Sequence, residues 1–302
     1  MALADPKSPV NTFFDEHLPH HEPFIRPWLK TLLRRPRGNP MPASPAPNII
    51  GAAIEFRIGF DLAKSFPYAA LAGDISLTAG IDAFRSLGYE PSTGSGELSM
   101  WQKVASDNDR DTSNDHDQQF AATRLCWQMA YLESIAYELP KTELNTPENL
   151  TAFWTHLRTE PSSEAVQVLL ELWRRYLGPA RSTLTGFGDP IAIRPTFANR
   201  FAAGDLLLGR TLIEVKCELR PENSLPRTLR QVLACALADS DDELSIESIG
   251  VYHAYEGSIV HWPLARALAS LSATGHASLP ELRARFADTV ATERRSIEER
   301  RR

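Results

Sequence analysis

The sequence of 302 residues has few cysteines and no long hydrophobic run. Its three cysteines, Cys126, Cys217 and Cys235, are an odd number at wide spacing, which argues against a disulfide framework and favours a reducing compartment. No apolar stretch approaches the roughly 18 residues that suggest a membrane span. Residues 1–21 also lack the basic and apolar regions of a secretory signal. We therefore expect a cytoplasmic protein without a membrane partner.

The chain also lacks an excess of positive charge. It has 32 Lys and Arg against 38 Asp and Glu, a formal net charge of −6. This balance argues against a protein that coats nucleic acid by bulk charge, but it leaves room for a local basic groove. A glycine-rich phosphate loop, a GxSxG nucleophile elbow and an HExxH zinc helix are missing as well. With 43% hydrophobic residues, the chain has enough apolar material for one large or two modest domains.

The first 180 residues form two regions that differ in proline content. Residues 1–48 are rich in proline, and we interpret them as an arm that packs locally, followed by a linker. The basic run at 34–37 is explained either as a solvated tail or as a segment that contacts phosphates. Residues 49–180 show apolar residues at helical spacing, clearest in 120–139 and 163–177, and predict a helical region.

Residues 181–302 have a different pattern. Short β-prone runs separated by glycine and proline precede a helical stretch at 227–239, and two strands are predicted at 248–254 and 258–262. A charged helix is predicted from residue 279 onward. The order strand, strand, helix, strand, strand predicts an α/β (α+β) core that follows the helical region.

A hairpin is predicted within this core. Two β-prone runs, 205–208 and 211–217, are separated by Gly209 and Arg210. A two-residue loop with glycine first is typical of a type II′ turn, which fixes the register of both strands.

The predicted register brings three charged side chains together. Asp205 lies opposite Glu214, and Lys216 shares their face of the sheet. Two opposed carboxylates repel, and a divalent cation between them removes that penalty. A lysine beside such a pair can orient or deprotonate an attacking water, or stabilise charge on a phosphate. The pattern thus suits metal-assisted phosphodiester hydrolysis.

The alternative is a hairpin whose exposed face happens to carry these charges. The alternate residues of the second strand lie on the opposite face, which is apolar and suited to a core: Ile213, Val215 and Cys217.

The same residues carry a resemblance to a known family. Gly204-Asp205 followed nine positions later by Glu214-Val215-Lys216, on consecutive strands before a helix, resembles the PD-(D/E)XK nuclease superfamily. The resemblance implies a restriction-endonuclease-like core with a mixed central sheet flanked by helices. It also implies Mg²⁺ bound by Asp205 and Glu214, with Lys216 acting on the attacking water.

The RecB-like branch of that superfamily places a Gln-xxx-Tyr motif on the following helix. Gln231 lies at the edge of the buried stripe predicted for this helix and matches the glutamine, which implies a supporting role at the catalytic site. Cys235 stands where the tyrosine is expected, so the second half of the motif is missing.

Further candidates lie outside this motif. Some members of the superfamily add an acidic residue from a helix before the sheet, and Glu55 is the first candidate for such a metal ligand; a solvated glutamate is the alternative. Arg194 and Arg200 are candidates for contact with nucleic-acid phosphates. His253 and His261 either border the site face or are core or edge histidines.

The expected function is therefore that of an Mg²⁺-dependent nuclease, with Mn²⁺ able to substitute, acting on nucleic acid and on DNA in preference to RNA. Bacterial defence and repair are both compatible with the resemblance. The alternative left open is a catalytically inactive module of the same fold that binds nucleic acid or protein. The acidic net charge and the missing tyrosine favour this alternative. A protein partner or a homodimer is compatible with either function.

Overall fold

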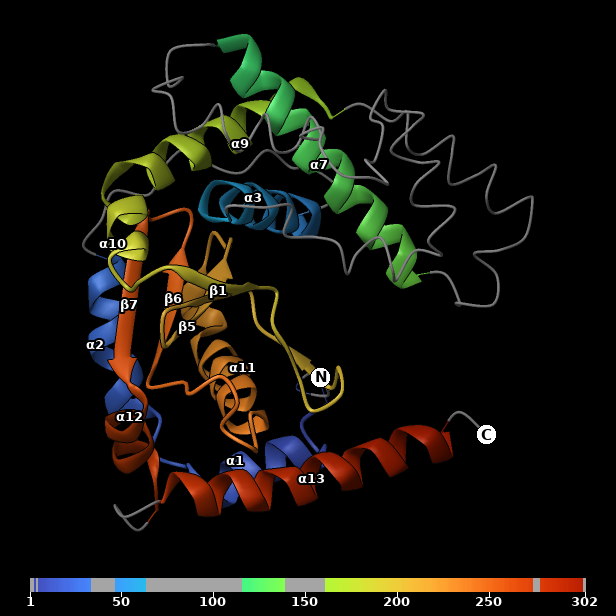
Figure 1. Cartoon of the computed structure of the whole chain (residues 1–302), viewed down its shortest axis with the longest axis vertical. Helices are drawn as coiled ribbons and strands as arrows, with labels where there is room; N and C mark the ends of the chain where they lie inside the picture. Colours follow the sequence, from blue (N-terminus) through green and yellow to red (C-terminus); the bar gives the residue numbers. More distant parts are fainter. Residues whose placement is uncertain are drawn as a thin grey trace. The chain divides into compact units, whose positions relative to one another are not determined.

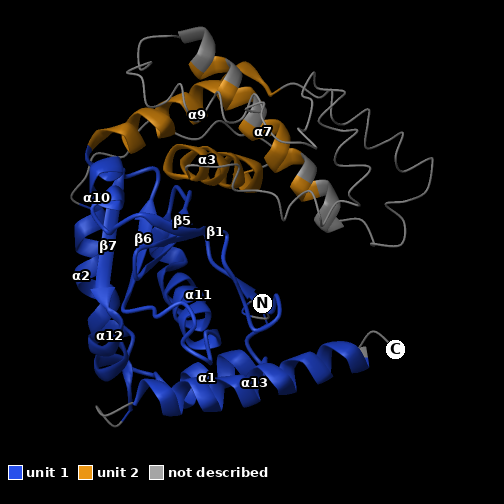
Figure 2. Ribbon diagram, in the orientation of Figure 1, with its two compact units in different colours: residues 1–38, 179–302 blue, residues 39–178 orange. Residues whose placement is uncertain are grey.

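The computed structural model describes residues 3, 5–33, 47–63, 116–138, 161–273 and 278–300. The chain divides into two units (Figure 2): unit 1 comprises residues 1–38 and 179–302, and unit 2 comprises residues 39–178. Unit 1 thus combines segments from both ends of the chain. The basic run at 34–37 lies outside the described residues.

A mixed sheet forms the centre of unit 1, with the strand order β1-β4-β5-β6-β7 (Figure 1). Neighbouring strands are antiparallel except β5 and β6, which are parallel. The α/β class expected from the sequence is confirmed, and so are the hairpin of β4 and β5 and the strand pair β6 and β7. The five strands are β1 (Pro190–Ile193), β4 (Leu206–Leu208), β5 (Thr211–Lys216), β6 (Ser248–His253) and β7 (Ser258–Pro263).

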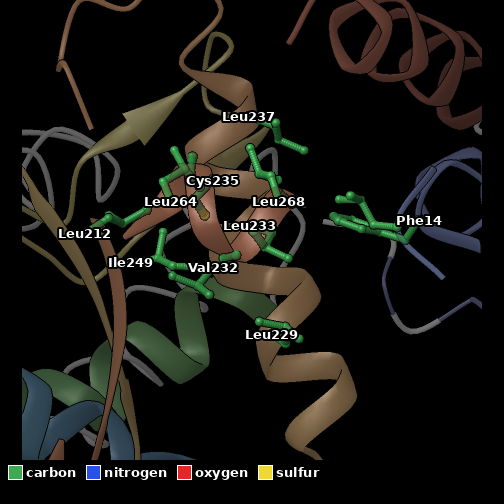
Figure 3. Close-up of a cluster of buried hydrophobic side chains, with 14 of the residues drawn as sticks. Phe14, Leu212, Leu229, Val232, Leu233, Cys235, Leu237, Ile249, Leu264 and Leu268 are labelled. Atoms are coloured by element: carbon green, nitrogen blue, oxygen red, sulfur yellow. The ribbon is translucent and has the colours of Figure 1, made fainter. Parts of the chain in front are cut away.

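The parallel pair requires a crossover, which is made by α11 (Leu225–Ala238) after the short 3-10 helix η3 (Pro221–Asn223). The helix buries its apolar stripe against β5 and β6. Figure 3 shows side chains of α11 gathered with Leu212 and Ile249 of the sheet and with Leu264 of α12 (Leu264–Leu271). The predicted stripe is buried throughout: Leu229, Val232, Leu233, Ala236 and Leu237.

Helices from the two chain ends complete this core. They are α1 (Pro9–His17), α2 (Glu22–Leu33) and α13 (Leu279–Arg300). Ser8 caps α1 by accepting a hydrogen bond from the Asn11 N–H at 3.2 Å, and Phe13 meets Phe286 of α13 edge-on. Trp28 of α2 packs on Trp262 of β7, with ring centroids 5.2 Å apart. The helices of the proline-rich segment are therefore part of the core of unit 1.

A small second sheet leads the chain into the central hairpin. It pairs β2 (Thr196–Phe197) with β3 (Ala202–Ala203), after α10 (Arg181–Thr185) and β1. Between the two strands, Ala198, Asn199 and Arg200 have φ values of 45°, 49° and 66°, a left-handed conformation that costs energy in residues other than glycine. Arg294 of α13 donates to the carbonyls of Ala198 and Asn199, which holds this turn in place.

The described part of unit 2 is helical. It contains α3 (Pro47–Leu62), α7 (His116–Glu138), α9 (Ser163–Arg175) and the start of the π-helical turn η2 (Tyr176–Ala180). Helix α3 packs against α7 and α9, and its buried Arg57 stacks over Trp173 at 4.3 Å while donating to the Gln119 carbonyl. The Tyr176 hydroxyl donates to Asp61 at 2.6 Å. Among the described helices, none is both long and apolar enough to cross a membrane.

The turn between β4 and β5 depends on one glycine. Gly209 has a φ of 52°, which fits the first position of the predicted type II′ turn. A Cβ atom at this position would clash with the carbonyl oxygen of Phe187. The Gly209 N–H also donates to the Asp189 carbonyl at 2.8 Å, which ties the turn to the start of β1.

We predict that Gly209→Ala lowers the free energy of unfolding by about 1–3 kcal/mol, because the alanine combines an unfavourable φ with a backbone clash. Denaturant unfolding monitored by circular dichroism measures this change. Gly178→Ala is the control, since no atom lies within 4 Å of a Cβ built on Gly178. Equal stability losses in the two variants would contradict the account of the turn.

Candidate functional site

The hairpin register positions the two carboxylates. Leu207 pairs with Leu212 and Leu208 with Thr211, as the sequence predicts. Asp205, immediately before β4, is held at two atoms: its carbonyl accepts from the Arg194 N–H at 2.7 Å, and its Oδ2 accepts from the Val215 N–H at 2.6 Å. The carboxylate of Asp205 is therefore fixed beside the strand that carries Glu214.

Three side chains from β5 and α11 form a closed hydrogen-bonded triangle. Glu214 is only 2% exposed, and its Oε1 accepts from Lys216 Nζ at 2.7 Å and from the side-chain amide of Gln231. Lys216 Nζ also donates to Gln231 Oε1 at 3.0 Å. The structure thus brings together the four residues that the sequence analysis singled out. The burial of Glu214 contradicts the alternative of an ordinary exposed face at that position.

Burial dominates the electrostatics of both carboxylates, and the charge of Asp205 adds to its effect on Glu214. Desolvation and the neighbouring Asp205 raise the pKa of Glu214 to about 8, against the opposing effect of Lys216. Desolvation likewise raises the pKa of Asp205, although Lys216, the Val215 N–H and Arg194 act in the opposite direction. For Lys216, burial lowers the pKa, but Glu214 and Asp205 more than offset this, so its pKa is raised and the side chain stays an ammonium.

The arrangement leaves acceptor atoms available for a cation. Among the described residues, Asp205 Oδ1 and Glu214 Oε2 have no hydrogen-bond partner, whereas the other oxygen of each carboxylate is occupied. Two carboxylates completed by water and phosphate oxygens are a donor set that suits Mg²⁺. Within the part of the chain that is described, no group of three or more His, Cys, Asp or Glu side chains is arranged to hold a metal ion. A cation at this site would therefore draw on these two carboxylates.

The remaining candidates fall at different places. Arg194 lies at the site: its backbone bonds to Asp205, its φ is 54°, and its charge lowers the pKa of that carboxyl. Arg200 is exposed in the turn between β2 and β3. Glu55 lies on α3 in unit 2, not in the unit that holds the four clustered residues. His261 lies on β7, in edge contact with Phe187 at 5.0 Å.

Cys235 takes a structural position next to the site. Its Sγ donates to the Ala203 carbonyl at 3.3 Å, which links α11 to β3 two residues before Asp205. Burial and the two carboxylates raise the pKa of the thiol well above its usual value, so it remains protonated. Cys235 therefore supports the backbone near Asp205.

Sequence reasoning missed the contacts that the N-terminal helices make around the site. Arg230, the residue before Gln231, donates to Asn11 Oδ1 at 2.9 Å and pairs with Asp15, both on α1. His253 is the register partner of Lys216, and Trp28 of α2 donates to its Nε2 at 3.0 Å. Alternating residues in β6 could have placed His253 on this face, but only if β6 was known to run parallel to β5.

A comparison of the chain with protein-family models, with curated proteins and with solved structures finds no match.

We predict that the metal-free protein loses stability as the pH rises, because of Glu214. Its folded-state pKa of about 8 exceeds the ordinary value of 4.5, so its favourable contribution is complete below about 4.5 and is lost as the pH rises through about 8. Glu214→Gln removes this titration. In a chelating buffer, the melting temperature of the parent should therefore fall more between about pH 5 and about pH 9 than that of the variant, by several degrees.

Glu247→Gln is the matched control for this measurement, because Glu247 is exposed and paired with Arg210 near the hairpin turn. It should show the pH dependence of the parent. If the melting temperature of Glu214→Gln depends on pH as that of the parent does, the pKa of Glu214 is not raised and the prediction is wrong.

Proposed function

We propose that the protein is a metal-dependent nuclease that hydrolyses phosphodiester bonds, with Mg²⁺ as its cofactor and Mn²⁺ as a substitute. The observation that carries this proposal is the pairing of buried Glu214 with half-buried Asp205, beside Lys216 and Gln231. Burying two carboxylates together is unfavourable, as their raised pKa values indicate. A bound divalent cation would offset this unfavourable free energy, and the arrangement therefore favours a cation-binding site.

The order of elements supports assignment to the PD-(D/E)XK fold. The residues of the motif lie on a hairpin, β4 and β5, and the helix that follows, α11, contributes Gln231 to the same cluster. The next strand, β6, returns parallel to β5 within a mixed sheet. We propose that this part of unit 1 is a restriction-endonuclease-like core.

The side chains suit distinct tasks in phosphodiester hydrolysis. A bound Mg²⁺ would supply a Lewis acid for the phosphate and lower the pKa of a bound water. Asp205 and Glu214 would hold it through their available oxygens. Lys216 stays protonated, so we assign it hydrogen-bond donation to the attacking water or to the phosphate, rather than proton abstraction. Gln231 holds the side chains of Glu214 and Lys216 in place through a hydrogen bond to each.

We infer that the substrate is nucleic acid, and DNA in preference to RNA, as the resemblance implies. The positive groups at the site favour a phosphate backbone despite the net charge of −6. Arg194 beside Asp205 is the residue we assign to phosphate contact, and Arg200 in the neighbouring turn is a second, more distant candidate. Defence against foreign DNA and repair both fit such an activity.

We predict that the parent protein cleaves DNA only when Mg²⁺ or Mn²⁺ is present. Asp205→Asn, Glu214→Gln and Lys216→Met should each lower kcat by about 100-fold or more, because each removes a cation ligand or the positive charge beside the reacting phosphate. Cleavage of labelled single-stranded DNA, duplex DNA and RNA measures this effect. Glu247→Gln should retain full activity, since Glu247 is exposed and paired with Arg210.

Two outcomes would overturn the nuclease assignment. Cleavage that survives in both Asp205→Asn and Glu214→Gln would place the activity elsewhere. A parent protein that binds DNA or RNA without cutting it in either metal would favour the inactive binding module.

A further inference from the structure

The lysine of the site has a neighbour on the adjacent strand. Lys216 of β5 and His253 of β6 are register partners in the parallel pair, so their side chains leave the same face of the sheet. The strands are joined at this level, because the Ala254 N–H donates to the Lys216 carbonyl at 2.8 Å. His253 therefore stands beside Lys216, on the side of β5 away from β4.

The imidazole is held by a residue from the other end of the chain. Trp28 of α2 donates its indole N–H to His253 Nε2 at 3.0 Å, across 225 positions of sequence. His253 is 1% exposed, and its Nδ1 has no hydrogen-bond partner among the described residues. The indole is thus the only described polar group that fixes the ring. Trp28 is itself buried, and Trp262 packs against it edge-on at 5.2 Å.

The hydrogen bond also keeps the imidazole neutral. An indole N–H can only donate, so the Nε2 that it contacts must be an acceptor and the ring proton must lie on Nδ1. Burial and the charge of Lys216 lower the pKa of His253 to about 3. A neutral ring next to Lys216 leaves the ammonium as the one positive charge of this strand pair that faces Glu214.

We propose that Trp28 and His253 are positioning residues of the site: the indole locks the imidazole, and the imidazole confines Lys216 to the orientation in which its ammonium contacts Glu214 and Gln231. This inference rests on the proposed nuclease function and extends it to α2. Helix α2 then positions a residue of the site in addition to packing in the core. A shift of about 1 Å in a group that acts on the reacting phosphate is enough to slow a reaction about 100-fold.

The test compares Trp28→Phe with two variants of the same helix. Trp28→Phe keeps an aromatic ring but removes the donor to His253. Ile25→Val and Leu32→Ala remove buried packing from α2 without touching that hydrogen bond, the first a little and the second more, so they show how a loss of stability alone affects activity. For each protein we would measure kcat and KM on DNA with saturating Mn²⁺, and the tautomer of His253 by ¹⁵N NMR.

We expect Trp28→Phe to lower kcat by about 10-fold or more with KM unchanged, and to shift His253 from the Nδ1–H form to a mixture of tautomers. Both packing variants should keep the parent's kcat at a temperature where they are folded. If Trp28→Phe is as active as these variants, or retains the parent tautomer, the positioning role is overturned while the nuclease assignment stands. A parent that cleaves nothing overturns the nuclease assignment and, with it, this role.

Discussion

The burial of two carboxylates at the open end of one hairpin is the constraint on which the rest of unit 1 depends. Burial raises the pKa of both carboxyls, Asp205 raises that of Glu214 further, and the surrounding structure offsets these effects only in part. The Val215 N–H, the Lys216 ammonium and the Gln231 amide each contribute a hydrogen bond. The pKa values of both carboxyls nevertheless remain raised. Such a pair does not favour stability by itself, and it is compatible with the proposed cation site.

The architecture of unit 1 follows from the need to hold these groups rigidly. The tight turn at Gly209 sets the register that brings Asp205 beside β5. The crossover helix α11 carries Gln231 on the face toward the sheet, while Arg230 on another face is anchored to α1. Helix α2 contributes Trp28, which donates a hydrogen bond to His253, the register partner of Lys216. Each side chain of the site is thus supported by an element that is itself buried in the core.

Local sequence signals were sufficient for the hairpin and for the placement of its charged side chains. Glycine followed by arginine specified the turn, and strand alternation then placed Asp205, Glu214 and Lys216 on one face; the apolar period of α11 left Gln231 at its edge. The position of His253 beside Lys216 and its hydrogen bond with Trp28 could not be predicted. They depend on a parallel strand pairing and on a packing contact over 225 positions, and neither leaves a local pattern. Arg194 and Arg200 looked equivalent in sequence, and only the backbone path separates them.

Calorimetric titration with Mn²⁺ at about pH 7, repeated in buffers of different ionisation enthalpy, tests the central claim most directly. Because the pKa of Glu214 is about 8 in the free protein, the carboxyl is mostly protonated at that pH, and a cation that binds the pair must displace the proton. The account predicts saturable binding with release of about one proton, and affinity that rises with pH. Binding without proton release, or the same binding in Glu214→Gln, would contradict it.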